Sequence, residues 1–94
     1  MYIIKRAKSF ERSFKKLAYS GITKKNKESI EFVIDAIASG LELNKKYRDH
    51  QLGGELKAYR ECHILNDLLL IYRIQKNELV LVLIDIGSHS QLFG

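Results

Sequence analysis

Four side chains of this sequence suit proton transfer if the fold gathers them: His50, His63, Asp67 and His89. A histidine gives or takes a proton near neutral pH because its ordinary pKa is about 6.5. Two or more imidazoles with a carboxylate suit the cleavage of an RNA phosphodiester without a metal ion or a cofactor. One group removes the proton from the ribose 2′-OH, another protonates the departing 5′-oxygen, and cations stabilise the charge on phosphorus.

The elements expected around these side chains bring three of them to one edge of a sheet. Three successive antiparallel strands are predicted, at about 56–64, 68–75 and 79–87, and the last two are nearly all apolar. The end of the first, the start of the second and the end of the third then lie at the same edge. We therefore expect His63, Asp67 and His89 to meet there, whereas nothing in the spacing fixes the position of His50.

The first half of the sequence predicts one strand and two amphipathic helices. Residues 2–5 are rich in β-branched and aromatic side chains, as is typical of a strand. Ser9 and Thr23 are expected to cap two helices, each with apolar residues on one face. Residues 41–54 lack this regular spacing of apolar residues and are expected to form a loop. The predicted fold is a single α+β domain over residues 1–94, a helix hairpin packed on a mostly antiparallel four-stranded sheet (β-α-α-β-β-β).

The composition indicates a small folded domain with a polyanionic partner. The 94 residues are 46% hydrophobic and 29% charged, which argues against disorder. Sixteen Lys and Arg against eleven Asp and Glu leave a net charge of +5, which favours nucleic acid or an acidic protein as partner. No apolar stretch approaches the roughly 20 residues of a membrane span. We expect a soluble, cytoplasmic protein with no membrane partner.

Basic and aromatic residues provide candidate RNA contacts. Lys15 and Lys16 extend the basic surface of the first helix, and Phe93 near the C-terminal end can stack on a base. Each also has a simpler explanation, because such lysines often line a solvated helix face and Phe93 can pack the terminus down. Likewise, His63 and Asp67 can hydrogen-bond each other across a turn without any catalytic role.

The metal-binding and thiol alternatives have weaker support. Three histidines and an aspartate can bind zinc, but their separations lack the short paired spacings of zinc motifs. The single cysteine, Cys62, excludes an intramolecular disulfide and favours a reducing compartment. It adjoins His63 but is expected to point to the opposite face of the sheet, where it would fill the core.

Several motifs of the second half resemble the YafQ toxins of the RelE/ParE superfamily, from bacterial type II toxin–antitoxin systems. The patterns are D-H-x-L, Y-R-x-x-H-x-x-x-D and G-[ST]-H-x-x-L-F-G, in this order. They occur within Tyr47–Leu52, Tyr59–Asp67 and Gly87–Gly94. The likeness is close from Tyr47 onward and weak over the two helices.

This resemblance implies a microbial-RNase-like fold and ribosome-dependent cleavage of mRNA in the decoding site. It also implies a cognate antitoxin as partner, besides the ribosome and mRNA. On the same analogy, Phe93 contacts mRNA and His89 is the general acid. Asp67 or His50 is the base, and His63 supports the phosphate.

The sequence departs from the family pattern at three positions. Gln51 replaces a proline and Leu56 a tryptophan, changes expected to alter only loop stiffness and packing. Asp85 replaces an arginine, and an acid near the scissile phosphate repels the developing charge. If Asp85 points toward the site, the stabilising charge must come from other cations: Arg48, Lys57 or Arg60.

Two other functions are compatible with the same scaffold. A noncatalytic ParE-like toxin acts by protein contact, for example with DNA gyrase, and does not need the histidines. A plain basic RNA-binding domain binds RNA in a salt-sensitive way without strand scission.

Overall fold

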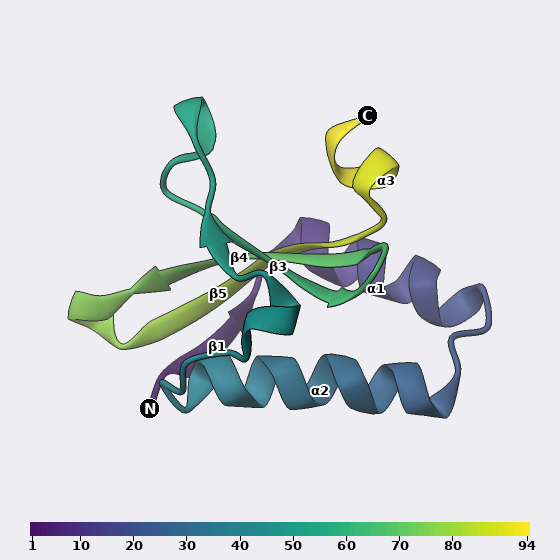
Figure 1. The fold of residues 1–94 in the computed structure, drawn as a ribbon, viewed down its shortest axis with the longest axis horizontal. Helices are drawn as coiled ribbons and strands as arrows, with labels where there is room; N and C mark the ends of the chain where they lie inside the picture. The colour runs from purple at the N-terminus through teal and green to yellow at the C-terminus, as the bar shows by residue number, and fades with distance from the viewer.

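The computed structural model describes all of residues 1–94, folded as a five-stranded sheet with three α-helices (Figure 1). The elements in chain order are β1 (Ile3–Arg6), α1 (Lys8–Tyr19), α2 (Lys24–Ala38), the 3₁₀ turn η1 (Lys45–Tyr47), β2 (His50–Gln51), η2 (Gly54–Leu56), β3 (Arg60–Leu65), β4 (Leu68–Gln75), η3 (Lys76–Glu78), β5 (Val80–Gly87) and α3 (His89–Phe93).

The strand order in the sheet is β1-β5-β4-β3-β2, with β1 parallel to β5 and every other pair antiparallel. This confirms the predicted α+β fold with a mostly antiparallel sheet. The predicted number of strands is wrong, because β2 pairs His50 with Glu61 and Gln51 with Arg60 inside the expected loop. A strand of two residues has no period of its own and becomes visible only beside its partner strand.

The strand expected over residues 56–64 begins later than predicted, at Arg60. Residues 54–56 form η2 instead, and Gly54 adopts a φ of +62°, a conformation that glycine adopts readily. The amide of Leu52 then donates to the carbonyl oxygen of Tyr59 at 3.0 Å, which closes the loop between β2 and β3.

The two long helices begin at different kinds of residue. Thr23 caps α2 as predicted, since its hydroxyl accepts a hydrogen bond from the amide of Asn26 at 3.1 Å. The prediction that Ser9 caps the first helix is wrong: the N-cap of α1 is Ala7. The Ser9 hydroxyl donates instead to the carbonyl oxygen of Ile84 in β5. This bond fixes α1 beside the part of β5 that β1 does not cover.

The core lies between the sheet and the helices. Ile30, Val33 and Ile37 of α2 are buried together with Phe10 of α1 against one face of the sheet. In Figure 1, α2 runs along this side, while the loop between β2 and β3 and the C-terminal α3 rise on the other side. None of the helices is both long and apolar enough to cross a membrane.

Cys62 is a core residue, as predicted. Its side chain is fully buried on β3, in the same cluster as the helix residues. Burial, followed by the nearby charges of Asp49 and Glu61, raises the pKa of the Cys62 thiol to about 12. The thiol is therefore neutral and unreactive at physiological pH.

Candidate active site

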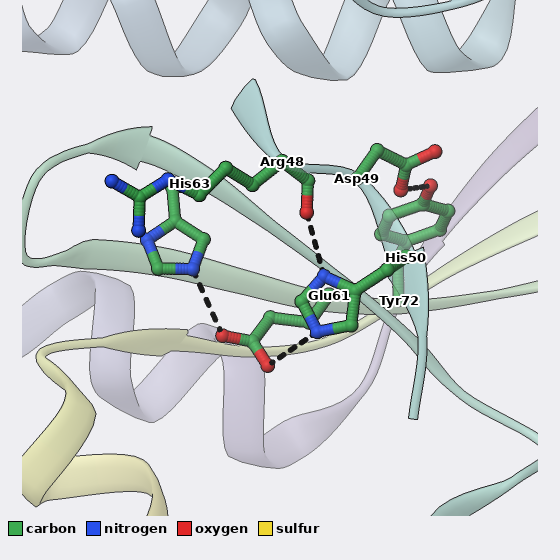
Figure 2. A network of polar contacts seen from close by, with 6 residues as sticks. All are labelled: Arg48, Asp49, His50, Glu61, His63 and Tyr72. Atoms are coloured by element: carbon green, nitrogen blue, oxygen red, sulfur yellow. Dashed lines mark hydrogen bonds and ion pairs between the residues drawn. The ribbon is translucent and has the colours of Figure 1, made fainter. Parts of the chain in front are cut away.

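A buried glutamate lies between two of the candidate histidines (Figure 2). Nε2 of His50 is 3.6 Å from one carboxylate oxygen of Glu61, and Nε2 of His63 is 3.5 Å from the other. Glu61 is only 6% exposed, so its charge is removed from water and requires positive or polar partners. The two imidazoles lie beside the carboxylate at these distances without a hydrogen bond to it, so both rings are gathered at one place.

The strand register explains this cluster. Glu61 and His63 are two residues apart on β3, so their side chains point to the same face of the sheet. His50 pairs directly with Glu61 across the β2–β3 ladder. The position of His50, which the sequence leaves open, is therefore set by this short strand pair.

The ring of His50 is oriented from both sides. Its Nδ1 lies 2.6 Å from the backbone carbonyl oxygen of Arg48, which can only accept a hydrogen bond, so Nδ1 carries a proton. Nε2 is left facing the carboxylate of Glu61. Arg48 has a φ of 49°, in the left-handed region that residues other than glycine seldom adopt. Such conformations concentrate at functional sites, where the surrounding structure holds them in place.

His63 is fixed at one nitrogen and free at the other. Its Nε2 faces Glu61, while its Nδ1 is buried without a hydrogen-bond partner. Figure 2 shows the Arg48 side chain extending to the side of the ring that carries this Nδ1. A buried nitrogen without a hydrogen-bond partner is unfavourable for the folded protein.

Asp67 and His89 meet at the edge of the sheet, as the strand order predicts. A carboxylate oxygen of Asp67 accepts a hydrogen bond from the backbone amide of His89 at 2.9 Å. His63 lies on the same edge, because Leu69 of β4 pairs with both His63 and Gly87. The contact of Asp67 with His89 is through the backbone, so Asp67 fixes the place where α3 begins.

The turn that carries His89 is held by a capping box. The Ser88 hydroxyl accepts from the amide of Gln91 at 3.2 Å, and the Gln91 side chain accepts from the amide of Ser88 at 2.8 Å. Gly87 makes this arrangement possible, because a Cβ there would lie 2.8 Å from Oε1 of Gln91. The ring of Phe93 lies 5.3 Å from the His89 ring, so α3 presents both rings together.

Asp85 lies on the same face of the sheet as Glu61, but its carboxylate is bound to α1. Its carboxylate accepts hydrogen bonds from the Ser13 hydroxyl at 2.6 Å and from the amide of Ile86 at 2.8 Å. Ile71 lies between Asp85 and Glu61 in the sheet, so two strand spacings, about 10 Å, separate their backbones. The two donors offset the charge of Asp85 at this position.

Arg60 lies on the face of the sheet opposite the histidine cluster, where it pairs with Asp49. Its guanidinium lies 3.1 Å from a carboxylate oxygen of Asp49, and the Tyr72 hydroxyl donates to the other oxygen. Burial and the hydrogen bond to Asp49 raise the pKa of Tyr72 above its ordinary value. Arg60 and Tyr72 pair in the β3–β4 ladder, one residue away from Glu61, so they lie on the opposite face.

The remaining candidate RNA contacts are spread over the surface. Lys57 is exposed at the end of η2, and its carbonyl oxygen accepts a hydrogen bond from the Gln51 side chain. Lys15 and Lys16 are exposed on α1, which packs beside β5 rather than beside the histidines. Of all the candidate cations, the structure brings Arg48 closest to the cluster.

Glu61 is the residue that reasoning from the sequence missed. An acidic residue in a strand suggests a solvent-facing position, but this one is buried between two histidines. The signal was its spacing, two residues before His63 on the same face of a strand. No three or more His, Cys, Asp or Glu side chains are grouped so that they could hold a metal ion.

A family model described as "Bacterial toxin of type II toxin-antitoxin system, YafQ" matches residues 2–94. The Escherichia coli K12 protein named "mRNA interferase toxin YafQ" is 38% identical over 58 residues, which are 62% of this chain and 61% of that protein. The matched segments span 39% to 61% of the length of the curated relatives.

Solved structures share the fold over the full chain. The metal-bound toxin from Helicobacter pylori has a TM-score of 0.88 at 42% identity, covering 99% of this chain and 100% of that one. YafQ from the E. coli DinJ–YafQ complex has a TM-score of 0.82 at 28% identity, with 100% of both chains covered. The match over residues 2–94 shows that the chain belongs to the YafQ family of bacterial toxins from type II toxin–antitoxin systems.

Proposed function

We propose that the chain, as one domain over residues 1–94, is a metal-independent endoribonuclease that cleaves mRNA on the ribosome and thereby inhibits translation. The observation that carries the proposal is the position of Glu61 between His50 and His63. A noncatalytic toxin or a simple RNA-binding domain gains nothing from a buried acid that orients two imidazoles. The name of the E. coli relative, an mRNA interferase, supports the same activity.

The reaction follows from the roles that this geometry supports. A base takes the proton of the ribose 2′-OH, and the 2′-oxygen attacks phosphorus as the bond to the 5′-oxygen breaks. An acid protonates that departing oxygen, so the products are a 2′,3′-cyclic phosphate and a 5′-hydroxyl. All proton transfers use side chains of the protein, and none requires a metal ion.

Of the two candidate bases, the geometry favours His50 over Asp67. The side chain of His50 is 51% exposed and its orientation is set by the Arg48 carbonyl and Glu61. One oxygen of Asp67 already holds the amide of His89. We therefore assign His50 as base and His89 as acid, and Asp67 as the residue that positions His89.

The charge on the phosphate is stabilised by His63 and Arg48 in this proposal. The Arg48 side chain reaches the same side of the cluster as the free Nδ1 of His63. Phe93, packed on His89, stacks on a neighbouring base. Contacts of RNA with Lys15, Lys16 and Lys57 stay predictions, and so does a contact with Arg60, which would compete with its ion pair to Asp49.

We also propose that the partner in the cell is an antitoxin, by analogy with the DinJ–YafQ complex of E. coli. The net charge of +5 favours an acidic segment as the part that covers the toxin. The proposed location of both is the cytoplasm, where ribosomes and mRNA are found.

A purified translation reaction tests the proposal. We expect wild-type protein to break mRNA only when ribosomes are present, and EDTA added to the isolated protein beforehand to leave the rate unchanged. His89→Ala should lower the rate about 10²–10⁴-fold, as is typical for loss of a proton-transfer group. Intact mRNA with folded wild-type protein would contradict the proposal, and inhibition of DNA gyrase supercoiling would support the noncatalytic alternative.

A further inference from the structure

A cavity of about 690 Å³ opens beside the proposed catalytic cluster, at the outer edge of β3. The two residues of β2 pair only with Arg60 and Glu61, so the rest of this edge has no strand beside it. The cavity occupies that position, between η1, α2 and the turn that joins β3 to β4. Its polar lining residues are Ser29, Lys46, Arg48, His63, Asn66 and Asp67.

The cavity is continuous with the cluster. His63 and Asp67 line its wall, and so does Arg48, whose carbonyl orients His50. His50 pairs with Glu61, so continuing the same strand register by two residues places Arg48 opposite His63. Figure 2 shows the Arg48 side chain reaching toward the His63 ring. A group bound in the cavity would therefore lie next to the bond that His50 and His89 are proposed to act on.

The charges of the lining favour an anion. Lys46 and Arg48 form no ion pair with a carboxylate; all the ion pairs in the protein involve Arg60, His50 or His63. The Lys46 ammonium lies 5.1 Å from the centre of the Tyr47 ring, which holds it at the cavity without neutralising it. The only acid in the lining is Asp67, and one of its oxygens is occupied by the His89 amide.

His63, which lines the cavity, also has a polar atom without a partner, its Nδ1. This nitrogen is buried. The volume lies within the range of about 300–1,000 Å³ that is usual for ligand sites and exceeds what a single phosphate needs. An RNA chain offers a phosphate with a nucleoside attached to it, and the amide of Asn66 can both donate to and accept from a base edge.

We propose that this cavity is a subsite for the RNA nucleotide next to the cleaved bond. Lys46 and Arg48 bind its phosphate, and Asn66 contacts its base. This inference rests on the proposed endoribonuclease function, because it takes RNA to be the substrate. It makes Lys46 a binding residue and Asn66 a specificity-determining one.

Adjacent lysines of η1 provide a matched test. Lys46 lines the cavity and Lys45 does not, so Lys46→Gln and Lys45→Gln remove the same charge from the same short element. We expect Lys46→Gln to raise KM for ribosome-bound mRNA about tenfold with kcat changed less, and Lys45→Gln to change KM less than twofold. Thermal unfolding monitored by circular dichroism verifies that both variants fold.

Amide NMR provides a readout that does not depend on cleavage. The wild-type protein is titrated with a short single-stranded RNA whose riboses are 2′-O-methylated, so that it cannot be cut. We expect the resonances of Lys46 and Asn66 to shift, and the shifts at Asn66 to weaken in Lys46→Gln but not in Lys45→Gln. Equal weakening in both variants, or no shift at Asn66 at any RNA concentration, would overturn the subsite. If wild-type protein cuts no mRNA, the proposed function fails, and the titration still decides whether the cavity binds RNA.

Discussion

The carboxylates of Asp49 and Glu61 lie on opposite faces of the sheet and differ in how closely their polar partners contact them. Asp49 is bound by the Arg60 guanidinium and the Tyr72 hydroxyl, and all of these groups have direct partners. Glu61 contacts its two histidines only at 3.5 and 3.6 Å, and one of them keeps a buried nitrogen without a partner. The first arrangement joins β2 to the core, whereas the second holds groups that can change partners when a substrate arrives.

This difference predicts that Glu61 is needed for activity and Asp49 for stability. The Glu61→Gln substitution keeps the shape of the side chain but removes the charge that orients both imidazoles. We expect cleavage of ribosome-bound mRNA to slow by about 10²–10³-fold, with little change in Tm, because the loss affects proton transfer. Single-turnover kinetics together with a melting curve measure both. Cleavage within threefold of wild type would show that the cluster is structural, like that of Asp49.

Gly87→Ala tests whether the position of His89 depends on the capping box of α3. The added Cβ would meet Oε1 of Gln91 at 2.8 Å and push this side chain off the Ser88 amide, which loosens the turn that positions His89. A displacement of about 1 Å can lower a rate by about 10²-fold, so we expect a loss of that order in kcat. Asp67→Asn keeps an oxygen that can accept from the amide of His89 and should lose less than tenfold. A loss for Asp67→Asn as large as for His89→Ala would instead identify Asp67 as the base.

Asp49→Asn should weaken the fold more than the chemistry. It removes the charge that pairs with Arg60 and weakens the hydrogen bond of the buried Tyr72 hydroxyl. Because Arg60 is partly exposed, we expect a loss of about 1–3 kcal/mol in the free energy of unfolding. Urea unfolding measures the loss, and the cleavage rate of the folded fraction should stay within tenfold of wild type. An unchanged midpoint would show that this network does not stabilise the fold.

Alkaline pH should lower the free energy of unfolding, because two buried groups on the helix-facing side of the sheet have raised pKa values. Burial raises the pKa of Cys62 from 9.0 to about 12 and also raises that of Tyr72. Above pH 9 the unfolded thiol releases its proton while the folded one keeps it, so stability is complete below pH 9 and falls as the pH rises. The slope is about 1.4 kcal/mol per pH unit for each group. Cys62→Ala should reduce the slope between pH 9 and 11, and an equal slope in wild type and variant would contradict this.

The layers of the fold could be predicted from the sequence because they depend on long periodic segments. The apolar stripe of α2 and the alternation in β3 fix which side chains enter the core, including Cys62. Strand direction then brings Asp67 and His89 together without any knowledge of side-chain contacts.

The features that the sequence did not predict depend on a very short strand or on contacts between residues far apart in the sequence. β2 has two residues, so no pattern locates His50, and Glu61 becomes buried only once His50 pairs with it. Ser9 is a plausible cap by residue type, but a bond to β5 uses its hydroxyl instead. The guanidinium of Arg60 is held by Asp49, a partner that only the three-dimensional structure places beside it.

The chemical ends of the cleaved mRNA test the central claim most directly. Mass spectrometry of fragments from the ribosome reaction, with protein treated beforehand with EDTA, identifies the groups on each side of the break. Attack by the 2′-OH, with His50 as base and His89 as acid, predicts a 2′,3′-cyclic phosphate facing a 5′-hydroxyl. A 5′-phosphate facing a 3′-hydroxyl, or cleavage that stops after EDTA treatment, would contradict the proposed chemistry.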